Sequence, residues 1–222
     1  MVSSMIKKLL VVPSSKGLTV WASLAPEYSL LIWNAATHQK IKNVLSNESS
    51  PIHDMVLHDG LVVVSSFKNL SIYSTESDKL CHWEAHSKNV DKIISVDEHI
   101  WSCSFAEICV WHVKQNAAEI NINLVKKINV HDTRIITLSN CVVLSDADHF
   151  IDIICSSSYD YNLIFWDPHA REPYREYKFE ENKEFARCFA ALDNSTILVG
   201  SSFVSRVSNH NGNLYVIKTD CL

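Results

Sequence analysis

Three residue types in the second half of the chain could in principle carry out nucleophilic hydrolysis. Ser158, His131 and Asp160 supply the hydroxyl, the base and the carboxylate that a catalytic triad requires. Ser156 lies on the same face of the predicted strand as Ser158, so either serine could be the hydroxyl member. The sequence contains no G-x-S-x-G motif, which would place a serine in an exposed, strained turn. We therefore expect no catalytic residue among them.

Two further groups contain residue types that bind metal ions: Asp146, Asp148, His149 and Asp152 in one turn, and Cys103, Cys109 and His112 across a predicted hairpin. The spacing of the acidic turn fits no calcium-binding loop, and the two cysteines lie in apolar runs. We expect no metal ligand in either group. The sequence also lacks a G-x-G-x-x-G motif and a P-loop, so we expect no cofactor and no small-molecule substrate.

The composition of the 222 residues is that of an ordinary globular protein, with 47% hydrophobic and 20% charged residues. The net charge of −5 argues against binding to a nucleic-acid backbone, and the apolar runs are too short for a membrane span. Lys7 and Lys8 precede only four apolar residues and Pro13, so no signal peptide is predicted. The seven cysteines form no C-x-x-C pair. Free thiols of this kind indicate a reducing compartment, and we expect a cytoplasmic protein.

A short phrase ending mostly in an aromatic residue recurs five times along the chain. Its last residues, which we call the anchors, are Trp33, Tyr73, Trp111, Trp166 and Ile217. A second phrase precedes four of them: Ser65-Ser66-Phe67, Cys103-Ser104-Phe105, Ser157-Ser158-Tyr159 and Ser201-Ser202-Phe203. Two phrases that recur together, one a short distance before the other, indicate an internal repeat.

Each repeat divides into short β-type runs separated by turn-forming residues. The second repeat is the clearest, with runs at Ile52–His58, Leu61–Phe67, Leu70–Ser74 and Leu80–Ala85. No stretch has a sustained helical period, so we expect almost no helix. The pattern predicts an all-β fold of about five four-stranded antiparallel propeller blades, in a single region over residues 1–222. The approximate repeat bounds are 5–45, 52–85, 90–130, 135–179 and 185–220. Residues 116–123 and 204–212 are predicted surface insertions.

The repeats resemble WD40 repeats. Trp166-Asp167 is a literal WD dipeptide, and Ala85-His86 and Val130-His131 resemble the Gly-His dipeptide that opens such a repeat. The resemblance implies a hydrogen-bond chain of His131, Asp160, Ser158 and Trp166 in the fourth repeat. In the third repeat it implies only a partial chain of His86, Ser102 or Ser104, and Trp111, because Glu107 stands merely near the position of the aspartate. The content of 4 glycines is low for this family.

Five repeats are few for a family whose typical ring has about seven blades, and the fifth repeat stops before an outer strand. We therefore predict a partial or open propeller. It would be a fragment of a larger propeller, the tail of a longer protein or, alternatively, a divergent small ring. Phrases such as Val20-Trp21-Ala22 and Ile100-Trp101-Ser102-Cys103 are loosely similar to the C-terminal propellers of DENN-domain and Rho exchange factors and of leucine-rich-repeat kinases.

The function that this fold implies is a non-catalytic scaffold that binds other proteins, with no nucleic-acid partner. The alternative is the regulatory propeller of a larger signalling protein, such as a guanine-nucleotide exchange factor or a kinase. Propeller loops carry most contacts. The candidate partner contacts are Lys68, Trp83, Arg134, Glu181, Lys183, Arg206 and His210.

Overall fold

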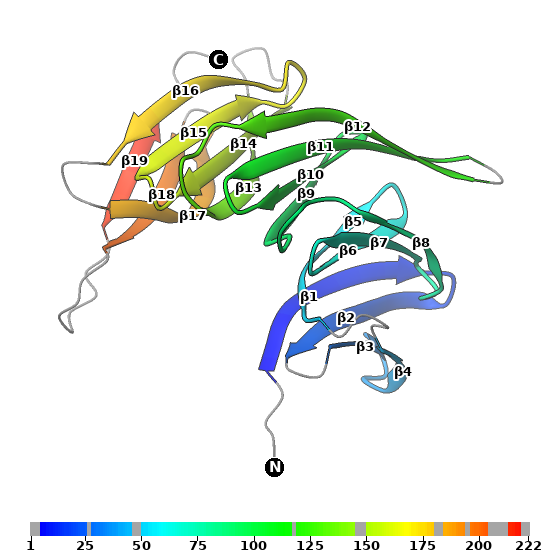
Figure 1. Ribbon diagram of the computed structural model, residues 1–222. Coiled ribbons are helices and arrows are strands. Elements are labelled where there is room, and N and C mark those ends of the chain that lie inside the picture. Colours follow the sequence, from blue (N-terminus) through cyan, green and yellow to red (C-terminus); the bar gives the residue numbers. More distant parts are fainter. Residues whose placement is uncertain are drawn as a thin grey trace. The chain divides into compact units, whose positions relative to one another are not determined.

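The computed structural model describes residues 5–25, 28–45, 50–116, 119–144, 150–179, 184–193, 196–203 and 213–218. Within these ranges the regular structure consists of β-strands, and none of it is helical (Figure 1). The described part of the chain accordingly has no helix with the length and apolarity needed to cross a membrane. The predicted all-β fold of about five antiparallel blades is confirmed.

The strands form five separate sheets, which we call blades 1 to 5, and each strand pairs with the next along the chain. Blade 1 contains β1 (Met5–Ser14), β2 (Gly17–Ala25), β3 (Ser29–Asn34) and β4 (Lys40–Leu45). Blade 2 contains β5 (Ile52–His58), β6 (Leu61–Ser66), β7 (Asn69–Ser74) and β8 (Lys79–Glu84). Blade 3 contains β9 (Lys92–Val96), β10 (His99–Ser104), β11 (Glu107–Gln115) and β12 (Ile120–Asn129). Blade 4 contains β13 (Ile135–Leu144), β14 (Phe150–Ser158), β15 (Asn162–Asp167) and β16 (Glu172–Lys178). Blade 5 contains β17 (Glu184–Asp193), β18 (Thr196–Phe203) and β19 (Leu214–Lys218).

The first hairpin of blade 2 shows how local sequence sets the strand register. His58 pairs with Leu61, which leaves Asp59 and Gly60 as a two-residue turn. Both turn residues have positive φ, 45° and 73°, as this type of hairpin requires. The tight Asp-Gly turn therefore fixes which residues of β5 and β6 share a face.

The chain folds as two compact units, residues 1–127 and 128–222. In the first unit β5 lies beside both β1 and β9, so the innermost strands bring blades 1, 2 and 3 together. We call the face of a blade that carries the anchor its rear face, and the opposite face its front face. The front face of blade 1, including Trp21 and Ile32, packs on the rear face of blade 2, including the anchor Tyr73. The front face of blade 2, including Ile72, packs in the same way on the rear face of blade 3, including the anchor Trp111.

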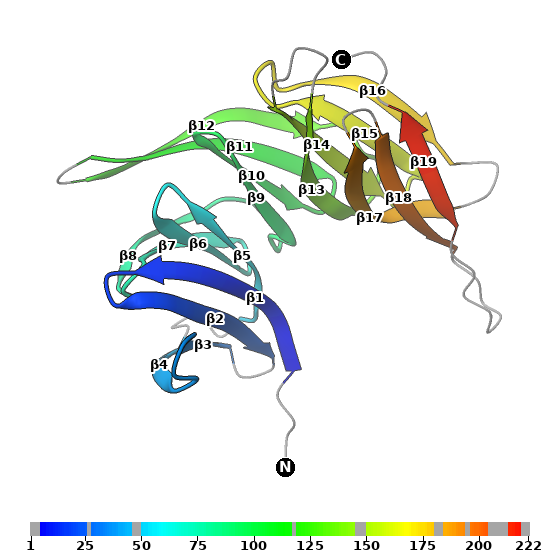
Figure 2. The ribbon, with the colours of Figure 1, turned by 180° about the vertical axis from the view of Figure 1, so that it is seen from behind.

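The second unit repeats this arrangement between blades 4 and 5, where β17 lies beside β13 (Figure 2). Its buried cluster joins Leu163 and Phe165 from the front face of blade 4 to Ile197 and the anchor Ile217 from the rear face of blade 5. Each unit therefore has its own apolar core between neighbouring blades. The prediction that residues 1–222 form one propeller region stays a prediction.

The outer hairpin of blade 3 differs from the expectation that residues 116–123 form a surface insertion. Strand β12 begins at Ile120, and the β11–β12 hairpin extends beyond β9 and β10 in both ribbon views (Figures 1 and 2). Ile120 and Ile122 pack against the core between blades 2 and 3. Their alternation with polar residues is a strand pattern, so the prediction of a surface insertion is wrong for this part of the segment. The other predicted insertion, 204–212, lies outside the described residues.

Candidate functional site

The fourth blade contains a continuous chain of side-chain hydrogen bonds that begins at its anchor. The indole Nε1–H of Trp166 donates to Ser156 Oγ over 2.9 Å. Ser156 Oγ lies 2.9 Å from His131 Nε2, and His131 Nδ1 lies 2.9 Å from Asp160 Oδ2. A neutral imidazole with its proton on Nδ1 satisfies every group, because Ser156 then donates to Nε2 and Nδ1–H donates to the carboxylate.

The acid at the end of this chain is strongly hydrogen-bonded. Burial by itself would raise the pKa of Asp160, but the hydrogen bonds from His131 and from the backbone N–H groups of Asn162 and Asp132 outweigh it and lower that pKa. The carboxylate therefore stays charged and holds the β14–β15 turn against the segment that precedes β13. With the side chains of His131 and Trp166 fully enclosed, the arrangement cross-links the blade and offers no nucleophile to a substrate.

The hydroxyl member of this chain is Ser156, which corrects the assignment to Ser158. Ser158 bonds instead to the backbone carbonyls of Thr133 and Arg134, at 2.9 and 3.0 Å. Both serines share a face of β14, but Ser158 lies about 7 Å further along the strand, at a rise of about 3.3 Å per residue. The indole of Trp166 reaches only the nearer hydroxyl.

The third blade contains the same chain in complete form, which corrects the expectation of a partial one. Trp111 Nε1–H donates to Ser102 Oγ over 2.9 Å, and Ser102 Oγ lies 2.8 Å from His86 Nε2. His86 Nδ1 lies 2.6 Å from Glu107 Oε1, so glutamate takes the place of aspartate. The extra methylene of Glu107 allows a residue at the start of β11 to reach the histidine.

The acidic end of this chain also contacts Lys127 and Cys109. Lys127 Nζ forms an ion pair with Glu107 Oε2, and Cys109 Sγ lies 3.6 Å from Glu107 Oε1 and 3.8 Å from His86 Nδ1. The histidine, glutamate and cysteine are types that bind zinc, and their donor atoms lie within 4.8 Å of one another. The three groups are satisfied by one another and by Lys127. Burial, and after it the charge of Glu107, raises the pKa of the Cys109 thiol to about 12, which favours the neutral thiol over a metal-binding thiolate.

The predicted partner contacts fall into different surroundings. Arg134 is exposed between the fourth-blade histidine and β13. Lys68, at the β6–β7 turn, pairs with Glu84. Trp83 is half-buried on β8, where its ring packs edge-on against Trp111 at 5.7 Å and its indole nitrogen is enclosed. Trp83 therefore belongs to the contact between blades 2 and 3. Glu181, Lys183, Arg206 and His210 lie outside the described residues, as do Asp146, Asp148 and His149.

The turn between the second and third strands holds an aromatic residue in a left-handed backbone conformation in three successive repeats. Phe67, Phe105 and Tyr161 have φ of 51°, 54° and 66°. Bulky side chains are uncommon at such angles, which cost about 1–2 kcal/mol per residue. Phe67 and Phe105 are nevertheless 46% and 43% exposed. The phrase repeat located Phe67 and Phe105 in the sequence, whereas Tyr161 lies two residues after the phrase residue Tyr159. Only the structure shows the strained backbone of all three.

Several buried polar residues were not singled out from the sequence. Asp54, 2% exposed on β5, forms an ion pair of 2.7 Å with Lys8 on β1 and accepts a hydrogen bond from the Ile93 N–H on β9. Glu184 of blade 5 accepts hydrogen bonds from Asn213 and Tyr215. No spacing signal marks either carboxylate, because these partners are distant in the sequence.

No protein-family model matches this chain. No curated protein matches it either. Among solved structures 978 chains match its fold, so the fold is common and by itself specifies no activity. One of them, in the crystal structure of a mitotic checkpoint complex, matches with a TM-score of 0.69 and 14% identity over 99% of this chain and 67% of that one. The repeated antiparallel blades and this likeness define a WD40-like propeller fold. The finer resemblance to exchange factors and kinases stays a prediction.

Proposed function

We propose that this protein is a non-catalytic scaffold that binds other proteins through the turns between the second and third strands of its blades. The observation that supports the proposal is the exposed aromatic residue at positive φ in this turn, at Phe67 and Phe105. Glycine or asparagine would fit the backbone better, and an apolar ring gains nothing from facing water. Strain of this kind that persists in successive repeats points to a functional role for the side chain.

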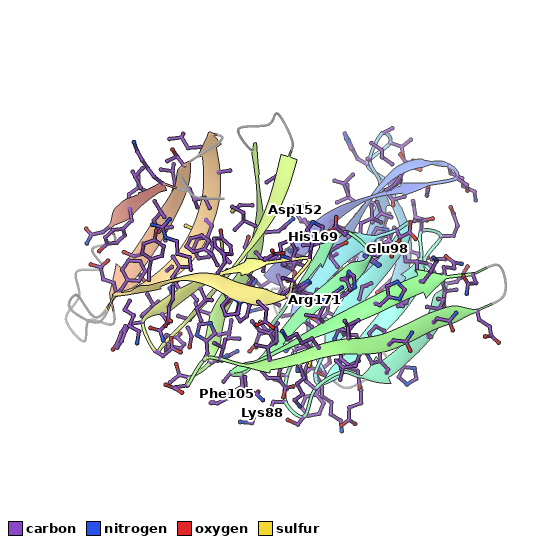
Figure 3. The ribbon with its side chains drawn as sticks, turned by 90° about the horizontal axis from the view of Figure 1, so that it is seen from above. Lys88, Glu98, Phe105, Asp152, His169 and Arg171 are labelled. Atoms are coloured by element: carbon purple, nitrogen blue, oxygen red, sulfur yellow. The ribbon has the colours of Figure 1, made fainter. Side chains whose placement is uncertain are left out.

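The two turns of the first unit belong to one continuous surface. The segment between blades 2 and 3 contacts both neighbouring blades through its backbone. The Val90 N–H donates to Phe67 O over 2.6 Å, and the Asp91 N–H donates to Cys103 O over 2.9 Å. Lys88 of this segment lies over the Phe105 ring, with Nζ 3.8 Å from its centroid (Figure 3). The surface therefore combines two exposed rings with a cation, and it fits a partner segment that presents apolar and acidic side chains.

Other features agree with a scaffold inside the cell. The polar residues of both histidine chains are engaged with one another in the blade interior, which supports a structural role for them. The six cysteines in the described residues are free thiols, as in proteins of a reducing compartment. These features support a cytoplasmic location, which we propose together with the scaffold function.

The experiment that tests this function exchanges both rings for glycine. In a Phe67→Gly, Phe105→Gly protein the loss of left-handed strain offsets the greater freedom of glycine in the unfolded chain, so stability changes by less than about 1 kcal/mol. The tagged wild type captures proteins from a cell extract, and mass spectrometry quantifies them. The double variant should recover the same proteins at least about tenfold less well, because each exposed aromatic contact contributes about 1 kcal/mol or more.

Asp59→Gly is the matched control, because Asp59 also has positive φ, 45°, but lies in the β5–β6 turn and carries no ring. It should leave the captured proteins unchanged. Equal recovery with the double variant and with this control would exclude the aromatic turns as the binding surface.

A further inference from the structure

A cavity of about 300 Å³ lies between blades 1 and 2 of the first unit. Its walls come from the β1–β2 turn, from β2, β3 and β4, and from the β7–β8 turn. Successive turns of an antiparallel sheet alternate between its two ends, so the cavity lies at the opposite end of the blades from the aromatic turns. Small-molecule sites have volumes of about 300–1,000 Å³, and a water molecule takes about 30 Å³. The cavity therefore has room for a small organic ligand.

Two hydrogen bonds between the blades hold the walls of the cavity together. The Ser15 N–H donates to Glu76 Oε1 over 2.8 Å, and Lys42 Nζ donates to Ser77 O over 3.1 Å. Both bonds join blade 1 to the β7–β8 turn of blade 2. Ile32, which is 3% exposed, forms part of the inner wall. All of the lining residues belong to blades 1 and 2, so the cavity is a feature of this unit alone.

The hydrogen-bond acceptors of the lining are already engaged within the protein. Asn34 Oδ1 accepts from two backbone N–H groups of its own turn, at 2.9 and 2.8 Å. Thr19 Oγ1 accepts from the Trp21 indole N–H over 3.1 Å. The Glu76 carboxylate and the Ser77 carbonyl accept the two bonds between the blades. A ligand that donates hydrogen bonds is therefore poorly matched to this lining.

Several donors of the lining, in contrast, form no hydrogen bond with any residue that the structure describes. They are the hydroxyls of Ser77 and Thr75, the side-chain N–H groups of Asn34 and the ammonium of Lys16. Ser77 is 6% exposed, and its φ of 73° is a conformation that glycine adopts more readily. Buried polar groups normally have a hydrogen-bond partner. The hydroxyl of Ser77 therefore calls for an acceptor inside the cavity.

Lys16 supplies a positive charge to the lining. Among the described lining residues, the cations Lys16 and Lys42 outnumber the one carboxylate, that of Glu76, which leaves a net charge of +1. Lys42 also lies 3.7 Å from Asp78, which is outside the lining. The two hydrogen bonds from Ser15 lower the pKa of the Glu76 carboxyl, so this group stays ionised and engaged. Lys16 is therefore the cation with which a ligand can pair.

We propose that this cavity binds a small organic anion, in which a phosphate or carboxylate group is attached to an apolar group. An ionised oxyanion accepts hydrogen bonds and does not donate them, so it matches a lining whose acceptors are engaged. The anionic group would accept from Ser77, Thr75 and Lys16, and the apolar part would lie against Ile32 and Ile41. No motif marks the site, because its residues come from segments distant in sequence. The inference does not rest on the aromatic turns.

Isothermal titration calorimetry with phenyl phosphate and with benzoate tests the site, because each probe joins an oxyanion to an aromatic ring. At least one of them should bind at a single site with a Kd of about 1 mM or tighter, and the tighter probe identifies the anionic group. Phenol, which lacks the anionic group, should bind at least about tenfold more weakly. Binding of phenol as tight as that of the anions, or no binding of either anion, would overturn the proposal.

Three variants test the lining. Lys16→Gln should weaken binding of the anion at least about tenfold, and Thr75→Val and Ser77→Gly about fivefold each. Valine keeps the shape of threonine and glycine suits the positive φ of Ser77, so both variants should fold, which circular dichroism checks. Lys40→Gln is the matched control, because Lys40 pairs with Trp33 on the opposite face of blade 1, and it should bind like the wild type. Equal affinities of the Lys16→Gln and Lys40→Gln proteins would overturn the proposal.

Discussion

The hydrogen bond between Trp166 and Ser156 allows the fourth-blade chain to be tested one contact at a time. Ser156→Ala removes the hydroxyl that accepts from the indole and bonds to His131, so two buried groups lose a partner. At about 1–2 kcal/mol for each, the variant should lose about 2–4 kcal/mol of unfolding free energy. Trp166→Phe removes the indole N–H together with part of the ring.

A double-mutant cycle separates the hydrogen bond from these other losses. Urea unfolding, followed by circular dichroism, gives the free energies of both single variants and of the double variant. Ser156→Ala and Trp166→Phe should show a coupling energy of about 1 kcal/mol, because each removes the same hydrogen bond.

The same cycle with Ser158→Ala is the control. Ser158 bonds to the carbonyls of Thr133 and Arg134, so its coupling to Trp166→Phe should stay below about 0.5 kcal/mol. Equal coupling for the two serines, or a larger one for Ser158, would refute the assignment of Ser156 to the chain.

Three further predictions concern the blade interiors. Trp166→Ala should cost about 3–5 kcal/mol of unfolding free energy, because the ring is fully buried; a loss under about 1 kcal/mol would mean that Trp166 is not at the anchor. Asp54→Asn should cost about 1–3 kcal/mol in the same urea assay, because it breaks the ion pair to Lys8, and a neutral result would show that this pair adds nothing. Burial lowers the pKa of His86 below its usual 6.5, against the opposing effect of the hydrogen bond that His86 donates to Glu107. As the pH falls, the unfolded chain takes up the proton at this histidine before the folded protein does. The contribution of neutral His86 to the unfolding free energy is therefore present above about pH 6.5 and is lost as the pH falls towards the lower folded pKa. In urea unfolding at a series of pH values, His86→Gln should flatten this decline in unfolding free energy, and the exposed His82→Gln should not.

The repeat and its strands could be predicted from the sequence because the signals are local. Alternation of apolar residues, turn-forming pairs such as Asp59-Gly60 and the recurring anchors all act within a few residues. The surface insertion expected at 116–123 was wrong for the start of β12, since Ile120 and Ile122 become part of the core when β12 pairs with β11.

Only the tertiary structure decided which polar side chains meet. Ser156 and Ser158 are equivalent in the sequence pattern, and the reach of the Trp166 indole across β14 selects one of them. Glu107 replaces aspartate because its side-chain length compensates for its position on β11. The sequence by itself determined the repeat, the strands and the anchors, because these depend on neighbours along the chain. Which face of each blade is covered, and which of its side chains remain exposed, was decided by the packing of one blade against another, because burial is a property of the assembled blades.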